Sequence, residues 1–208
     1  MTADLYVSLA RMLDYPHEKE SLLLAQRVVE GYCDGKGKGL ACSVRPFAEF
    51  MTGSTLAEIQ ETYVATFDFN PSVAPYLGHH LFGDNRKKGA YLIALKGEYG
   101  RHGYTPLGNE LPDHLPVILW FLAHLAHEGS ADARKSFIDR HVLPGVGKLG
   151  DSFAVSRRDS PWRPVVETLR TVCGEDSSRG TVPTESSGDD VPEKSCLNMV
   201  AHPEVSPC

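Results

Sequence analysis

The sequence lacks long apolar runs and any recognisable secretory leader, and each absence excludes a class of protein. No stretch of the 208-residue chain approaches the roughly 20 consecutive apolar residues of a membrane-spanning helix. The first segment, MTADLYVSLARMLDYP, contains acidic residues and lacks the basic start and cleavage site of a secretory signal. We therefore expect a protein without a membrane span that resides in the cytoplasm.

Paired cysteines are also absent. The five cysteines are odd in number, far apart and never arranged as Cys-x-x-Cys: Cys33, Cys42, Cys173, Cys196 and Cys208. This pattern favours reduced thiols in an intracellular compartment over a disulfide framework.

Positive charge is scarce, and the surplus of negative charge lies near the C-terminus. The net charge is −6, and residues 174–208 contain seven acidic against two basic residues. The remaining chain is nearly neutral and has no basic stripe, so we expect no nucleic-acid partner. Residues 174–208 are also rich in Ser, Pro and Gly and almost free of aromatics, which predicts a disordered tail after a folded domain of residues 1–173.

The folded part shows helical periodicity and no convincing strand alternation. Thr55 and Glu58 have the spacing of a capping box, and Asp84 and Asp113 are positioned to cap the two apolar segments that follow them. Gly129 is expected to end the second of these helices. The sequence predicts one all-α helical-bundle domain of roughly eight to ten helices.

Signatures of nucleophilic catalysis are missing: the chain has no Gly-x-Ser-x-Gly elbow and no cysteine in a histidine-paired context. Four side chains could instead serve an all-α metal-dependent hydrolase: His79, His80, Asp84 and His114. Enzymes of that kind carry a His-Asp dipeptide, whereas this chain has the reverse order. The hydrolase stays open as an alternative.

Two further histidines, His124 and His127, have the spacing of metal ligands on a helix. They fall at the end of the predicted helix, where positively charged side chains are favoured by the helix dipole. We interpret them as the polar end of that helix.

The stretch PSVAPYLGHHLFG (71–83) is too broken for a core helix and too apolar for an ordinary loop. Beside PDHLP (112–116), it would give a groove with apolar walls and acidic residues at its rim. Such a groove suits an amphipathic peptide helix with a basic end. Taken alone, however, the residues favour a simple core role for these apolar side chains.

Four motifs in register carry a family resemblance: YVATFDF (63–69), HHLFGDNRKKGAYL (79–92), ELPDHLPVILWFLA (110–123) and SPWRPVVETL (160–169). Together they resemble the cytoplasmic molybdoenzyme maturation chaperones, the group that includes the nitrate reductase assembly chaperone and related redox enzyme maturation proteins. The likeness spans about residues 1–173. Trp120 replaces a glutamate typical of the nitrate reductase branch, which leaves the client open.

The resemblance implies an all-helical chaperone without catalytic turnover, metal or cofactor of its own, present as a monomer or homodimer. Its partner would be the N-terminal segment of a molybdenum oxidoreductase catalytic subunit, held until the molybdopterin cofactor is inserted. Carried over residue by residue, the peptide-binding positions fall on Tyr76, Leu77, His80, Leu81, Phe82, Asp84, Glu110, Pro112, Asp113 and His114. Asp113→Ala or Tyr76→Ala would then weaken client binding and leave the fold intact.

Overall fold

A computed structural model describes residues 1–35 and 43–179. The predicted all-α fold is confirmed: the described residues form ten α-helices and no strand, with a short 3₁₀ turn, η1 (Pro71–Val73), and a π-helical turn, η2 (Ile138–Val142). The helices are α1 (Ala3–Leu13), α2 (Lys19–Asp34), α3 (Arg45–Gly53), α4 (Leu56–Phe67), α5 (Leu77–Phe82), α6 (Lys87–Arg101), α7 (Leu115–His127), α8 (Ala131–Phe137), α9 (Leu143–Ser156) and α10 (Arg163–Ser178).

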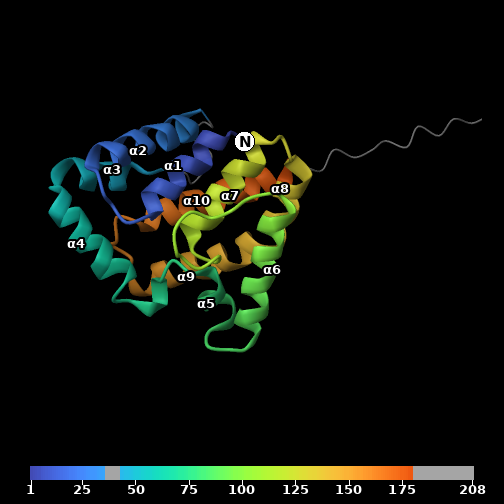
Figure 1. The fold of residues 1–208 in the computed structure, drawn as a ribbon. Helices are drawn as coiled ribbons and strands as arrows, with labels where there is room; N and C mark the ends of the chain where they lie inside the picture. Colours follow the sequence, from blue (N-terminus) through green and yellow to red (C-terminus); the bar gives the residue numbers. More distant parts are fainter. Residues whose placement is uncertain (36–42, 180–208) are drawn as a thin grey trace, which may run out of the picture.

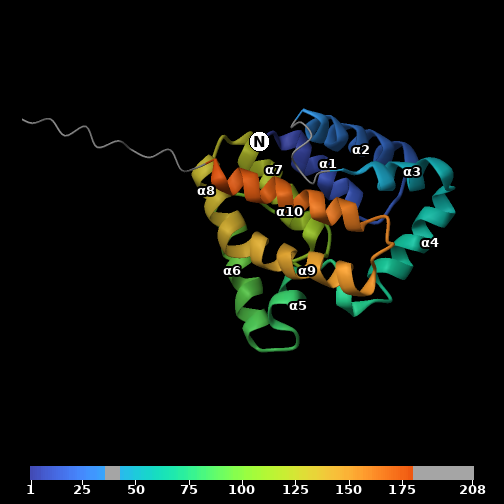
Figure 2. The same ribbon diagram turned by 180° about the vertical axis from the view of Figure 1, so that it is seen from behind.

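Helix α7 forms the centre of the bundle. Nine of its 13 residues are buried, because its apolar side chains cover nearly the whole circumference. Helix α1 packs along α7, and α2 packs on α1 (Figure 1). From behind, α10 and α9 run across the bundle, while α5 and α6 lie at the opposite end from α3 (Figure 2). LPVILWFLAHLAH is therefore principally core.

An aromatic cluster around Trp162 holds the end of α1. The indole is buried and lies 5.8 Å from the ring of Phe47 and 5.5 Å from the ring of Tyr63, measured between centroids. Its N–H donates to the Met12 carbonyl (2.9 Å), and the Tyr63 hydroxyl donates to the Leu13 carbonyl (3.2 Å). Two of the last carbonyls of α1 are thus satisfied by core side chains, which fixes where the chain leaves the helix.

Two predicted helix ends are confirmed, whereas the predicted caps Asp84 and Asp113 are wrong. Thr55 and Glu58 form a complete capping box, and Gly129 follows α7 with a φ of 69°. Asp84 does not cap α6. That helix begins at Lys87, and its cap position is Arg86, which makes no side-chain capping hydrogen bond. The Lys87 backbone N–H donates instead to the Asn85 side chain (2.9 Å).

Helix α10 continues to Ser178, so the first five residues of the predicted tail (174–178) are helical. Asp176, in its last turns, is buried and accepts hydrogen bonds from Tyr6 Oη (2.6 Å) and Arg134 Nε (2.6 Å). Composition could not reveal this partnership, because both partners come from other helices. The rest of the predicted tail, residues 180–208, lies outside the described residues.

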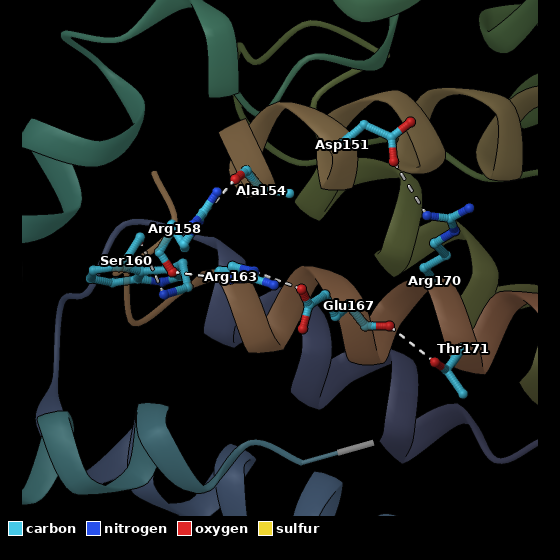
Figure 3. A network of polar contacts seen from close by, with 9 residues as sticks. Asp151, Ala154, Arg158, Ser160, Arg163, Glu167, Arg170 and Thr171 are labelled. Carbon is cyan, nitrogen blue, oxygen red and sulfur yellow. Dashed lines mark hydrogen bonds and ion pairs between the residues drawn. The ribbon is translucent and has the colours of Figure 1, made fainter. Parts of the chain in front are cut away.

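Exposed ion pairs cover the surface between α9 and α10 (Figure 3). Arg163 pairs with Glu167 along α10 (2.7 Å), and Arg170 reaches Asp151 on α9 (3.6 Å). Each such pair contributes little stability, since water screens it.

Two further expectations concern the membrane and the cysteines. Within the described ranges, no helix is both long and apolar enough to cross a bilayer. Cys173 is a buried free thiol, whereas Cys33 is disulfide-bonded. The expectation of five reduced cysteines is therefore wrong at Cys33, because an odd count and wide spacing do not exclude a single bond.

Candidate functional site

Two loops far apart in the sequence are joined by a short antiparallel bridge between Tyr76 and His114. The Leu77 N–H donates to the Asp113 carbonyl (3.0 Å), and the Leu115 N–H donates to the Pro75 carbonyl (2.8 Å). The loop before α5 is thereby fixed against the loop before α7. The structure thus brings together the two stretches that the sequence singled out.

Asp113 is a buried link between these loops, and its predicted role as the cap of α7 is wrong. The cap position is His114, and Asp113 is 0% exposed. Its Oδ2 accepts a hydrogen bond from the Gly78 N–H (3.0 Å), while Oδ1 has no hydrogen-bond partner among the described residues. Burial raises the pKa of Asp113, and the bond from Gly78 opposes that rise.

Glycines allow this close approach. A Cβ atom at Gly78 would lie 2.7 Å from Asp113 Oδ2, and one at Gly145 would lie 2.9 Å from Leu77 Cβ. Leu77 is fully buried, and the Pro112 carbonyl accepts a hydrogen bond from Tyr99 Oη (2.6 Å). Leu77, Pro112 and Asp113 consequently form a frame beneath the surface, although the resemblance had placed them on it.

Above this frame lies a cavity of about 600 Å³, called here the acidic cavity. Four aromatic rings and three carboxylates line it, and Lys88 is the single lysine or arginine among its lining residues. The aromatic residues are Tyr15, Tyr63, Phe67 and Tyr76, and the acidic residues are Asp14, Asp68 and Glu110. Apolar walls with a net negative charge would accommodate a cation that carries an apolar stem.

Tyr76, Glu110 and His114 form the polar centre of the acidic cavity. Tyr76 Oη donates to Glu110 Oε2 (2.9 Å), and His114 Nδ1 lies 4.0 Å from the same oxygen. Burial and the bond to Glu110 raise the pKa of Tyr76 to about 12. Burial lowers the pKa of His114, which the neighbouring carboxylates of Glu110 and Asp14 oppose.

The remaining predicted peptide-binding residues do not line the acidic cavity, whereas His79, named for the hydrolase alternative, does. His80 Nε2 is hydrogen-bonded to the Ala74 carbonyl (2.7 Å), Phe82 packs on Tyr91, and Asp84 is exposed. Leu81 packs partly buried against the core.

The geometry gives the hydrolase alternative no support. In the part of the chain that the structure describes, no three His, Cys, Asp or Glu side chains gather in a way that could hold a metal ion. His124 lies against the His102 carbonyl (2.9 Å), and the His127 side chain is 82% exposed.

Sequence reasoning missed most of the cavity wall contributed by α1 and α4. No sequence feature singled out Asp14 or Tyr15, and Tyr63 and Phe67 were named only as part of the YVATFDF motif (63–69). The position of Asp14 could not be predicted from neighbouring residues in the sequence. It is set by the aromatic cluster, whose side chains come from α4 and from the turn before α10.

The sequence profile described as "Nitrate reductase delta subunit" matches residues 34–149, more than half of the chain. The chain belongs to this family. The family expected from the four motifs is thus confirmed.

Named relatives agree with the assignment. Over 109 residues, the chain is 35% identical to the nitrate reductase molybdenum cofactor assembly chaperone NarJ of Bacillus subtilis. The aligned region covers 52% of this chain and 55% of that protein. It is 28% identical over 131 residues to NarJ of Escherichia coli K12, covering 62% and 55%. The chain therefore spans about half the length of these relatives.

A solved structure supports the fold. A redox enzyme maturation protein from Archaeoglobus fulgidus superposes with a TM-score of 0.52 at 17% identity, covering 86% of this chain and 93% of that one. At this identity the likeness concerns the fold alone.

The buried Asp113 gives a first prediction about stability. Asp113→Ala leaves the Gly78 N–H without its acceptor, so we expect the free energy of unfolding to fall by about 1–3 kcal/mol. Urea denaturation followed by circular dichroism measures it. Glu110→Ala is the control, since its half-exposed side chain should change stability by less than about 0.5 kcal/mol. Equal stability of the two variants would contradict the buried role of Asp113.

Proposed function

We propose that this protein is a maturation chaperone that binds the N-terminal segment of a molybdenum oxidoreductase catalytic subunit. It would assist folding, insertion of the molybdopterin cofactor and assembly before export or membrane attachment. Membership of the nitrate reductase delta subunit family and the assembly-chaperone relatives support the proposal. Because those relatives are named for nitrate reductase, its catalytic subunit is the first candidate client.

The acidic cavity is the observation on which the proposal rests. Three carboxylates around aromatic walls favour the guanidinium or ammonium group of a client residue. Glu110 and Asp14 would pair with the cation, while Tyr15 and Tyr76 would cover its apolar stem. The cavity would take one side chain of the client segment. We infer that the protein acts without catalysis and in the cytoplasm.

The frame beneath the cavity would hold the two loops of the site in place before a segment binds. Glu110 and Tyr76 come from two loops that the Tyr76–His114 bridge and the Asp113–Gly78 hydrogen bond hold together. A preorganised pair of loops loses little conformational freedom when a segment binds. Binding energy is therefore available for the client and is not consumed by ordering the site.

Calorimetric titration with a synthetic peptide tests this function. The peptide would carry about the first 20 residues of the nitrate reductase catalytic subunit of the same organism. We expect Glu110→Gln to weaken binding by about 1–3 kcal/mol, because a hydrogen bond to a charged partner is lost. Asp84→Asn is the matched control, since this exposed acid lies outside the cavity, and it should bind like the parent chain.

Two outcomes would contradict the proposal. If the parent chain does not bind the peptide, or the matching peptides of other molybdenum oxidoreductases, the chaperone function is wrong. If Asp84→Asn weakens binding and Glu110→Gln does not, the site lies at the turn before α6 and not in the acidic cavity.

A further inference from the structure

The exposed large apolar side chains of the described residues concentrate around the acidic cavity. Five of nine line that cavity or a neighbouring one: Tyr15, Phe69, Leu107, Leu111 and Trp120. Exposed apolar surface gathered in one region is typical of an interaction site, whereas isolated exposed residues need no explanation.

One neighbouring cavity, of about 500 Å³, is called here the Trp120 cavity. Its lining includes the apolar side chains of Leu107, Pro116, Val117 and Trp120. The Leu107 side chain is 92% exposed, at the tip of a loop whose glycines Gly103 and Gly108 have positive φ values. Leu107 therefore contributes almost nothing to the core, and its apolar surface is available to a partner.

A second neighbouring cavity, of about 400 Å³, is called here the Phe69 cavity. Tyr15, Val64 and Ala65 line it together with Phe69, which is 80% exposed. Gln60 and Glu61 complete the lining.

Shared residues establish the order of the three cavities. The acidic cavity shares Asp14, Glu110 and His114 with the Trp120 cavity, and it shares Tyr15 with the Phe69 cavity. The two apolar cavities share no lining residue. The acidic cavity thus lies between them, and the order along the surface is apolar, acidic, apolar.

We propose that the three cavities form one groove, and that the segment it binds carries a cationic residue flanked on both sides by large apolar residues. This inference rests on the proposed function and specifies its client. The cation enters the acidic cavity, one apolar side chain packs between Leu107 and Trp120, and the other packs on Tyr15 and Phe69. Three anchors, each matched to a cavity, fix both the register and the direction of the segment.

Trp120 is then a specificity-determining residue. Its indole is 37% exposed on the outer face of α7 and lines the Trp120 cavity. A glutamate there would place a fourth carboxylate beside Glu110 and would favour a second cation. Trp120 instead selects a large apolar side chain, because aromatic walls gain from apolar burial.

Affinity measurements with substituted proteins and peptides test the groove. Trp120→Ser and Leu107→Ser should each weaken binding of the client peptide at least about tenfold, as expected for a buried anchor. Ile93→Ser is the matched control, since Ile93 is 73% exposed and lines none of the three cavities, and it should bind like the parent chain. Phe69→Ser tests the opposite end in the same way.

A permuted peptide tests the order of the anchors. It keeps the composition of the client peptide but places both large apolar residues on one side of the cation, and we expect at least about tenfold weaker binding. Tryptophan fluorescence provides a second readout, because Trp120 is exposed to acrylamide quenching and Trp162 is buried. Binding of the client peptide should protect Trp120 from acrylamide quenching. A peptide in which the apolar residue that packs between Leu107 and Trp120 is changed to serine should give no such protection.

The outcomes separate this inference from the proposed function. If the client peptide does not bind the parent chain, the proposed function and the inference both fail. If it binds, but Trp120→Ser and Leu107→Ser behave like Ile93→Ser and quenching is unchanged, the three-cavity groove is wrong while peptide binding stands. Equal affinity for the permuted peptide overturns the proposed order of anchors.

Discussion

Asp176→Ala is expected to lower the free energy of unfolding by about 3–5 kcal/mol, because it leaves Arg134 as an unpaired charge in the interior. The Arg134 and Asp176 side chains are 8% and 4% exposed, and Arg134 Nη2 adds a second hydrogen bond (3.1 Å) to Asp176 Oδ1. Burial opposes ionisation of Asp176, yet the hydrogen bonds from Arg134 and Tyr6 outweigh it and lower the pKa of Asp176. Urea denaturation measures the loss.

Two control variants test whether the loss of stability comes from breaking a buried ion pair. Asp151→Ala breaks the exposed pair with Arg170 and should cost less than about 1 kcal/mol. The double variant Arg134→Met, Asp176→Ala removes both charges, so it should recover part of the stability lost by Asp176→Ala alone. If Asp151→Ala and Asp176→Ala are equally destabilising, Asp176 does not anchor α10.

Trp162→Ala is expected to have an effect of similar size, about 3–5 kcal/mol, because it leaves a large cavity among aromatic rings. It also removes the donor to the Met12 carbonyl, which releases the end of α1. Thermal and urea unfolding measure the stability, and peptide titration should show weaker binding, since Asp14 and Tyr15 follow directly after that end.

The conservative change at this position separates packing from hydrogen bonding. Trp162→Phe keeps an aromatic ring in the cluster and loses only part of the volume and the indole N–H, so it should be less destabilising than Trp162→Ala. Leu107→Ala serves as the surface control, and it should leave unfolding nearly unchanged because Leu107 is 92% exposed. Unaltered stability in Trp162→Ala would contradict the role of the cluster.

The architecture was predictable because its causes are local. Helical periodicity, the Thr55–Glu58 capping box and Gly129 each act within a few residues, and each is found as expected. Failures occur where a distant partner competes with the local rule. Asp113 is a good N-cap residue by type, but its carboxylate bonds to Gly78, which lies 35 positions away in the sequence. The same competition keeps Asp176 in the helix at a position where composition predicts a tail.

The candidate site was predictable only in part. Tyr76, Glu110 and His114 were found from the two unusual loops, and the structure brings them together. Asp14, Tyr15 and Phe67 could not be found in this way, because they reach the cavity through packing between α1, α4 and Trp162. The sequence predicted that Asp113→Ala would weaken client binding and leave the fold intact. Because Asp113 is buried, we expect this substitution to lower the free energy of unfolding as well.

The loop that carries Leu107 and Glu110 is a part of the protein that can accept substitutions during evolution. Both side chains are largely exposed, so substitutions there should leave the free energy of unfolding almost untouched. Gly78 and Gly145, which pack against Asp113 and Leu77 of the frame, tolerate no such freedom, since added atoms would collide. If the proposed groove binds the client, mutational tolerance and client choice coincide in one loop. A descendant could acquire a different client by altering that loop and keep the same scaffold.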